Sequence, residues 1–210
     1  MNSLPVAKEA FWYITFLLVI SIALYFLYAP LSTVSLVLLA FVVFFFRNPG
    51  REVPEGSNFV VSPADGVVMS VSEIDEPVFL KSKAVKVSIF LSVFNVHINR
   101  SPINGVVKYK AYRPGKFLPA FKSHASEVNE RNTIGIEGSG IRVLVHQITG
   151  FIARRIVCWS DIDNSLEIGE RFGLIKFGSC TEIVLPLNVE LKVKPGDKVR
   201  GAITVIGVIN

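Results

Sequence analysis

Two stretches near the amino terminus contain no charged residue and consist almost entirely of apolar side chains. The first is "FWYITFLLVISIALYFLY" (11–28) and the second is "LSTVSLVLLAFVVFFF" (31–46). As helices that rise about 1.5 Å per residue they would extend roughly 27 and 24 Å, close to the hydrocarbon thickness of about 30 Å. Ala29 and Pro30 join them. The sequence therefore predicts a two-helix transmembrane hairpin, with a re-entrant hairpin as the alternative.

The apolar segments are predicted to form a retained membrane anchor, residues 1–48. A secretory signal peptide has a basic amino-terminal region and one short apolar core, whereas here Lys8 is followed by Glu9 and a second apolar run follows the first. Arg47 and Arg51 come just after the second run. Because basic residues concentrate on the cytoplasmic side, we expect the following domain to face the cytoplasm at the cell (inner) membrane.

The remainder of the chain is predicted to be a linker, 49–58, and one domain, 59–210. The linker is rich in proline, glycine and charge, and the domain contains short apolar or alternating runs between turn signals. This pattern is typical of a mostly β, β-rich α+β domain. The segments "SPADGVVMSV" and "VKPGDKVRGAITVIG" resemble the halves of a lipoyl-type barrel-sandwich. In such a domain the two ends of the chain pair with each other.

Charge and cysteine content narrow the function classes. The net charge of +5 lies beyond the anchor, so the domain is expected to sit close to anionic membrane lipid. The sequence contains no helix-turn-helix, zinc or aromatic RNA-binding pattern, so no nucleic-acid partner is expected. Two cysteines, Cys158 and Cys180, make neither a disulfide framework nor a metal set. We expect a reducing compartment and no metal.

The three histidines differ in their surroundings. His146 lies in the alternating apolar run "RVLVHQITGF" and is interpreted as a core or strand-face residue. His124, in "AFKSHASEVNER", is either a surface residue or a headgroup contact. His97, in "FNVHINRSPINGVV", stands where an apolar strand gives way to polar residues. A side chain at such a strand end can face a cleft, which makes His97 the candidate for chemistry.

Two polar positions admit both a structural and a chemical interpretation. In "GLIKFGSCTEIVLP" the triplet from Gly178 to Cys180 interrupts a buried strand, either as a structural kink or as a reactive peptide bond beside the hydroxyl of Ser179. Asp65, in "SPADGVV", suits a hairpin turn. With His97 and Ser179 it also gives an Asp, His, Ser order, in which a carboxylate orients an imidazole that deprotonates a hydroxyl.

Several motifs together carry a resemblance to a known family. They are "SPADG", "FNVHINRSP", "SHASEVNER", "QITGFIARRIV" and "GERFGLIKFGS", and they follow the two-span amino-terminal anchor. In this combination the chain resembles, over essentially its whole length, the short bacterial and archaeal type of phosphatidylserine decarboxylase proenzyme. The resemblance implies a membrane-bound carboxy-lyase of phospholipid biosynthesis, which converts phosphatidylserine to phosphatidylethanolamine and CO₂.

The resemblance also implies that the proenzyme cuts itself. Cleavage at Gly178-Ser179 would give a β chain, 1–178, and an α chain, 179–210, which stay associated. Ser179 would become a pyruvoyl group that forms a Schiff base with the substrate amine. Because this covalent group is the electron sink, no diffusible cofactor and no metal are expected.

Residue roles follow from the same resemblance. Asp65 and His97 are expected to activate Ser179, and His97 is also the candidate for proton delivery after decarboxylation. Arg100 stands where longer relatives have a second histidine, and Cys180 stands where the short type commonly has arginine. Candidate ligands of the lipid headgroup are Arg100, Lys176, Arg154, Arg155 and His124.

Three other functions stay open at this stage. An archaetidylserine-type decarboxylase would use the same chemistry on an ether lipid. A membrane-tethered lipoyl-like adaptor would lack catalysis, although the usual Met-Lys-Met setting of a modified lysine is absent. A serine hydrolase would use the same triad, although no Gly-x-Ser-x-Gly elbow is present. The sequence leaves the oligomeric state open, a homo-oligomer included.

Overall fold

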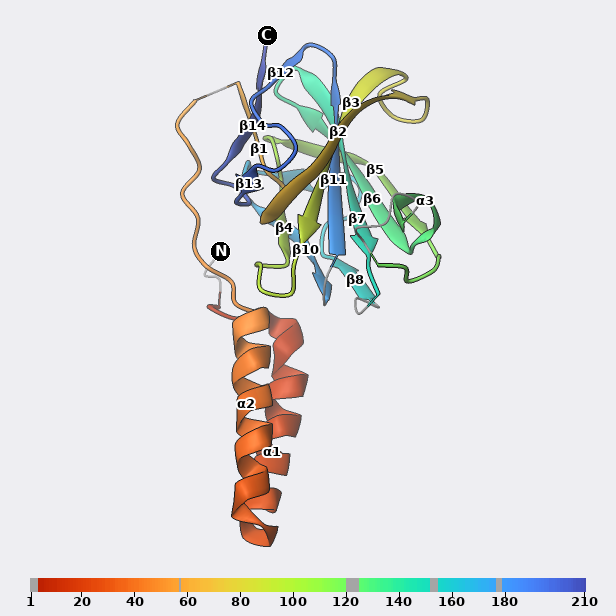
Figure 1. Cartoon of the computed structure of the whole chain (residues 1–210). Coiled ribbons are helices and arrows are strands. Elements are labelled where there is room, and N and C mark those ends of the chain that lie inside the picture. Colours follow the sequence, from red (N-terminus) through yellow and green to blue (C-terminus); the bar gives the residue numbers. More distant parts are fainter. Residues whose placement is uncertain (1–3, 57, 120–124, 152–154, 177–178) are drawn as a thin grey trace. The chain divides into compact units, whose positions relative to one another are not determined.

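The computed structural model describes residues 4–56, 58–119, 125–151, 155–176 and 179–210 (Figure 1). The chain divides into two compact units, with the boundary between Gly50 and Arg51. The first unit is helical. The second contains all the described strands and one short helix, α3 (Ala125–Val128), so the predicted β-rich domain with few helices is confirmed.

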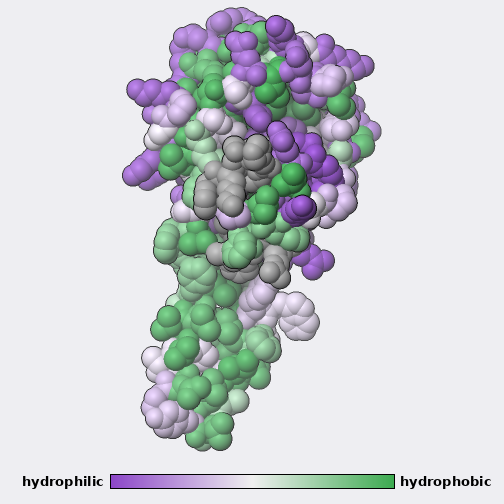
Figure 2. Space-filling model, turned by 45° about the vertical axis from the view of Figure 1, so that its right-hand side comes forward, coloured by the Kyte–Doolittle hydropathy of each residue, from purple (hydrophilic) through white to green (hydrophobic). Residues whose placement is uncertain are grey.

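The first unit is a pair of apolar helices. A 3₁₀ turn, η1 (Lys8–Ala10), leads into α1 (Phe11–Leu27), and Tyr28 in extended conformation connects α1 to α2 (Ala29–Phe45). The helices touch through small polar side chains, since Ser21 Oγ and Ser35 Oγ are 2.7 Å apart. Outward-facing side chains are almost all apolar, as Figure 2 shows.

The helical prediction is therefore confirmed within one or two residues, whereas membrane crossing by both helices is not. The segment Lys8–Leu27 is long and apolar enough to cross a bilayer. Ala29–Phe45, with 17 residues, is a shorter apolar helix. A bilayer crossing needs about 20 residues of helix, which explains the difference.

The described residues of the second unit form three antiparallel sheets. The largest has the order β13-β2-β3-β11-β7-β6-β5-β9, and two three-stranded sheets have the orders β1-β14-β12 and β4-β10-β8. The strand bounds are β1 Phe59–Val61, β2 Gly66–Glu76, β3 Ser82–Leu91, β4 Ile98–Arg100, β5 Gly105–Arg113, β6 Arg131–Gly138, β7 Ile141–Thr149, β8 Arg155–Cys158, β9 Ser165–Leu166, β10 Arg171–Lys176, β11 Ser179–Pro186, β12 Val189–Leu191, β13 Lys198–Val199 and β14 Val205–Ile209.

The two ends of this domain pair with each other, as the sequence predicted. β1 pairs with β14, and β2 pairs with β13. The large sheet curls so that one of its faces encloses a core of aliphatic side chains, among them Ile89, Ile134 and Ile183. This closure ties the last strands of the chain to the first strands of the domain.

Strand β11 occupies the centre of the large sheet, between β3 and β7. All its residues except Pro186 are buried, so both of its faces are covered. Alternation along the strand directs Thr181 to one face and Cys180 to the other, where Cys180 packs with Ile148. Ser179 begins the strand on the Thr181 side. The first residue of this central strand is therefore held by hydrogen-bonded neighbours on both sides.

Candidate active site

Ser179 is a buried serine at the first position of β11. It is paired in register with Leu91 of β3 and with Thr149 of β7, and it has an exposed fraction of 0%. Its Oγ has no hydrogen-bond partner within the part of the chain that the structure describes. Leaving a buried hydroxyl unpaired costs about 1–3 kcal/mol, so its retention needs a reason. Gly178 lies outside the described residues.

His97 lies immediately before β4 and is 2% exposed. Its Nδ1 is 3.0 Å from the backbone carbonyl oxygen of Asn95. A carbonyl oxygen can only accept, so Nδ1 carries the hydrogen and donates it. In the neutral imidazole the lone pair is then on Nε2, which is the nitrogen able to take a proton.

One side-chain contact relates the strand of His97 to the strand of Ser179. Asn99 Nδ2 donates to Thr181 Oγ1 over 2.9 Å. Ser179 and Thr181 are two residues apart in β11 and share a side of that strand, and His97 is two residues before Asn99, next to the start of β4. Ile175 N, in the strand that leads towards Ser179, donates to the carbonyl of His97 over 3.1 Å. Both contacts favour a common space for the imidazole and the hydroxyl.

A chain of buried amides holds this arrangement in place. Asn132 Nδ2 donates to Gln147 Oε1 over 2.8 Å, and Gln147 Nε2 donates to Asn99 Oδ1 over 2.9 Å. Gln147 Nε2 also reaches the carbonyl of Val157 at 3.3 Å. Because Asn99 then donates to Thr181, the chain links β6, β7, β4 and β11 without a solvent-exposed member. None of these four residues was among the site residues predicted from the sequence.

Gly173 makes room for the amide chain. A Cβ at this position would lie 2.4 Å from the carbonyl oxygen of Val157 and 2.7 Å from Gln147 Nε2. Both distances are shorter than real contacts of this kind. The "RFGLIK" strand therefore needs glycine at its third residue for Gln147 to reach Asn99.

Asp65 has well-defined partners other than the imidazole. Its Oδ2 accepts from Arg51 Nη2 at 2.7 Å, and its Oδ1 accepts from Gly201 N at 2.8 Å. The Arg51 side chain is 9% exposed, although the sequence suggested a charge at the membrane surface. Burial, then Arg171 and Arg51, lower the pKa of Arg100 to about 10, and Asp65 acts in the opposite direction. The Asp65 carboxylate thus lies among arginines, of which Arg100 is buried and Arg51 and Arg171 are half-buried.

The candidate headgroup ligands divide into three sets. Lys176 and Arg155 lie opposite each other in the β10–β8 ladder, and Arg155 is exposed. Like charges directly opposite repel each other, which favours an anion between them. Arg100 is buried and donates to the carbonyl of Gly169 over 2.9 Å. Arg154 and His124 lie outside the described residues.

Residues 38–207 match the family described as phosphatidylserine decarboxylase. A curated relative from Carboxydothermus hydrogenoformans, named phosphatidylserine decarboxylase proenzyme, is 55% identical over 201 residues. The match covers 95% of this chain and 94% of the relative. The chain belongs to the phosphatidylserine decarboxylase family. The resemblance predicted from the sequence motifs is thereby confirmed.

Two further phosphatidylserine decarboxylase proenzymes show how far the similarity extends. The relative from Symbiobacterium thermophilum is 48% identical, with 96% of this chain and 94% of the relative covered. The relative from Geotalea uraniireducens is 44% identical, with coverage of 98% and 97%. Because the alignments include nearly all of this chain and nearly all of each relative, the similarity extends over the sequences of both the helical unit and the β unit. Enzymes of this family are carboxy-lyases of phospholipid biosynthesis, and the word proenzyme marks a precursor.

In this member of the decarboxylase family, His146 is a structural residue, as predicted. It is buried on the sheet face opposite Ser179, and its Nδ1 lies 2.8 Å from Thr133 Oγ1. Burial lowers the pKa of His146 to about 3, and Arg131 and Lys86 act in the same direction. The imidazole is therefore neutral in the folded protein at physiological pH.

His146 gives a testable dependence of stability on pH. Its folded-state pKa of about 3 lies below the ordinary value of 6.5, so between these limits the unfolded chain binds a proton that the folded protein does not. The free energy of unfolding should therefore fall on acidification, by at most about 1.4 kcal/mol per pH unit. We expect His146→Gln to flatten the curve of melting temperature against pH between 6.5 and 4. An unchanged slope would contradict this.

Both cysteines are free in the structure. Burial raises the pKa of the Cys180 thiol well above its ordinary value, with Glu182 acting in the same direction. Burial also raises the pKa of Cys158. A raised pKa disfavours the thiolate, which is the nucleophilic form, at both positions. Among the described residues, no group of three or more histidine, cysteine and acidic side chains could hold a metal ion.

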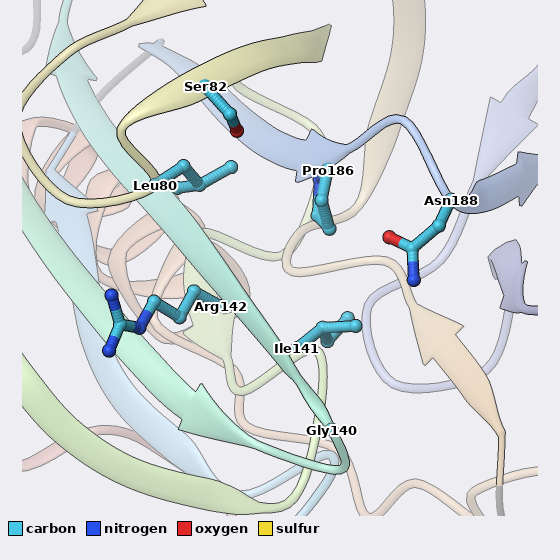
Figure 3. Close-up of a pocket in the computed structure, with 7 residues that line it drawn as sticks. All are labelled: Leu80, Ser82, Gly140, Ile141, Arg142, Pro186 and Asn188. Carbon is cyan, nitrogen blue, oxygen red and sulfur yellow. The ribbon is translucent and has the colours of Figure 1, made fainter.

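A shallow hollow at the other end of β11 is separate from this site. It has a volume of about 200 Å³ and is lined by residues that include Gly140, Arg142, Pro186 and Asn188 (Figure 3). Pro186 is the last residue of β11, so the hollow lies roughly 23 Å along the strand from Ser179 at about 3.3 Å per residue. Arg142 is paired with Glu137. Its described lining includes the hydroxyl of Ser82 but no histidine, cysteine or acidic side chain that could act as a base beside it.

Proposed function

We propose that this chain is a phosphatidylserine decarboxylase that generates its pyruvoyl group by cutting itself before Ser179. The observation that carries the proposal is the buried Ser179 Oγ, which has no hydrogen-bond partner among the described residues, at the start of β11 in a family of proenzymes. An unpaired hydroxyl in a dry site is a destabilising feature of the folded precursor. It is accounted for if the hydroxyl is consumed as a nucleophile.

The proposed cleavage begins at the hydroxyl. Ser179 Oγ attacks the carbonyl carbon of residue 178 while His97 Nε2 takes the hydroxyl proton. The peptide C–N bond breaks, His97 returns the proton to the amide nitrogen, and the amide becomes an ester. Loss of the Cα proton of Ser179 then expels the carboxylate of residue 178 and leaves dehydroalanine. Water adds to the imine form and ammonia leaves, which gives the ketone of a pyruvoyl group.

The residues around Ser179 fit such a group. The new ketone replaces the serine itself, so the backbone of β11 between Leu91 and Thr149 would hold it. The pyruvoyl group supplies a carbonyl that condenses with the substrate amine and withdraws the electrons left by CO₂. His97 Nε2 would then be the proton donor to the substrate carbon. The Asn95 carbonyl keeps the imidazole oriented for both tasks.

The fragments would stay together after cleavage. The α chain, 179–210, contributes β11 to β14, and these strands pair with strands of the β chain. β11 pairs with β3 and β7, β14 with β1, and β13 with β2. Breaking one peptide bond at the edge of this network removes no strand pairing. The active fragment pair is therefore stable without a covalent link.

Several finer assignments belong to the same proposal. Lys176 and Arg155 would bind the lipid phosphate, with Arg154 and His124 as additional candidates. Asp65, whose carboxylate is hydrogen-bonded to Arg51 and Gly201, would partly balance the positive charge of Arg100. Its effect on His97 would be indirect, through Arg100. Both apolar helices would span the inner membrane as a hairpin with the β domain in the cytoplasm. An ether-linked archaeal substrate would present the same headgroup to this site.

Intact-mass analysis of the purified protein tests the proposal. We expect two polypeptides of 178 and 32 residues, the smaller one lighter than its sequence by one ammonia and reactive with a hydrazide. An adaptor without catalysis and a serine hydrolase would both remain one chain of 210 residues. A single uncut chain that nevertheless converts phosphatidylserine to phosphatidylethanolamine would overturn the proposal.

A further inference from the structure

Exposed aromatic residues surround the end of the domain at which Ser179 lies. β3 and β7 both run antiparallel to β11, so both end where β11 begins. Beyond Leu91, the last residue of β3, the turn carries Phe94, which is 68% exposed. Beyond Thr149, the last residue of β7, Phe151 is 67% exposed. Figure 1 shows the arrowhead of β7 and the strands β8 and β10 at this end of the domain.

A third phenylalanine is fixed to the same end. Asn129 accepts from Leu118 N over 2.9 Å and donates to the carbonyl of Thr149 over 2.7 Å. Phe117 precedes Leu118 and is 38% exposed. Phe94, Phe117 and Phe151 thus lie on separate loops that are each connected to a neighbour of Ser179. We call these three residues the aromatic rim.

Exposed phenylalanine is confined to the rim in the described part of the β domain. Phe59, Phe79, Phe90 and Phe172 are all buried or half-buried. Exposed aliphatic residues do occur elsewhere, such as Val78 and Leu187 at the opposite end of the large sheet. An exposed apolar patch that is bordered by polar residues is characteristic of a surface that contacts another protein or a membrane.

Basic side chains accompany the rim. Arg113 and Lys116 come just before Phe117 in the chain and are exposed, and Arg155 and Lys176 are paired in register in β8 and β10, whose strands come between Phe151 and Ser179 in the chain. One exposed acidic residue, Glu127 of α3, lies beside Arg113, which donates a hydrogen bond to its backbone carbonyl. Aromatic rings suit the boundary between headgroups and acyl chains, and basic residues are attracted to anionic lipid. This charge complementarity distinguishes a bilayer surface from a neutral apolar partner.

We propose that the aromatic rim inserts into the interfacial layer of an anionic bilayer and presents the Ser179 site directly to lipid headgroups. This inference rests on the proposed function for the identity of the reactive centre. It adds a second membrane contact, made by the β domain itself. The substrate amine then reaches position 179 while its acyl chains stay in the bilayer.

The first test separates interfacial docking from chemistry. Full-length protein with Phe94→Ser, Phe117→Ser and Phe151→Ser combined is compared with wild type and with a Val78→Ser, Leu187→Ser control. We expect the triple variant to cleave itself normally and to turn over a short-chain, water-soluble phosphatidylserine at the wild-type rate. Turnover of long-chain phosphatidylserine in vesicles that contain anionic lipid should fall about tenfold or more, because apolar area drives interfacial binding. The control should retain vesicle turnover.

Two results would overturn the rim proposal without touching the proposed function. One is unchanged vesicle turnover in the triple variant. The other is an equal loss on soluble and vesicle substrate, which would mean damage to the site itself. If the triple variant instead changed only the oligomeric state, the rim would be a contact between copies of the chain. Failure of wild type to cleave itself and to turn over the soluble substrate would reject the proposed function instead.

A second measurement reports insertion directly and does not depend on activity. Phe151→Trp adds one indole at the rim, and Leu187→Trp adds one at the opposite end as the matched control. In vesicles whose acyl chains carry bromine, we expect the added emission of Phe151→Trp to be quenched, and that of Leu187→Trp to be unaffected. If bromine quenched the added emission of Phe151→Trp no more than that of Leu187→Trp, insertion of the rim would be refuted.

Discussion

Ser179→Ala should leave the chain as one uncut polypeptide of 210 residues without decarboxylase activity. The reason is that alanine has no oxygen with which to attack the preceding carbonyl, so neither the ester nor the pyruvoyl group can form. Folding should not suffer. The wild-type hydroxyl is buried without a described partner. Its removal should therefore lower the free energy of unfolding by no more than about 1 kcal/mol, or should raise it.

Ser88→Ala is the matched control for this variant. Ser88 lies in β3 beside β11, is buried, and donates from its Oγ to Glu182 over 3.0 Å. Its loss removes a hydrogen bond to a carboxylate, so we expect a destabilisation of about 1.5–3 kcal/mol with complete self-cleavage. The more stable variant should thus be the inactive one. Gel and mass analysis after expression decide this, and a split Ser179→Ala chain would eliminate the mechanism.

The fold could be predicted as far as local patterns reach. Uninterrupted apolar runs identified both helices, and short runs between turn signals identified a β domain whose ends pair. The partners of β11 could not be derived, because a strand buried on both faces shows no alternation and carries no information about register. The apolar pattern could not decide whether α2 crosses a membrane, because its 17 residues are near the lower limit of length for a transmembrane helix.

The candidate site could be predicted only where its residues interrupt a local apolar pattern. Ser179 and His97 were predicted as site residues because polar residues interrupt apolar strands there, and their reactive roles stay predictions. Gln147 was missed, although it shares a strand side with Val143 and Val145, both core residues, and this spacing was the available signal for a buried polar group. Arg51 was assigned to the membrane surface. Its pairing with Asp65 depends on a tertiary contact, which local sequence does not encode.

His97→Asn should slow self-cleavage by about 10²–10⁴-fold, the usual contribution of a positioned general base. Asparagine is the sharpest replacement, because its amide nitrogen occupies the place of Nδ1 and can still donate to the Asn95 carbonyl. The nitrogen that is lost is Nε2, which the proposed mechanism uses to accept the Ser179 proton. Fragment formation with time after synthesis is the measurement, with melting temperature as the check on folding.

The matched control replaces the other described histidine. His146→Asn removes an imidazole that is neutral, hydrogen-bonded to Thr133 and on the opposite face of the sheet. It should therefore lower stability without slowing cleavage. If His97→Asn matures at the wild-type rate, His97 is not the base. If both variants slow cleavage in proportion to their loss of stability, the effect comes from weakened folding. A slow but well-folded His97→Asn beside a fast but destabilised His146→Asn would assign proton transfer to Nε2 of His97.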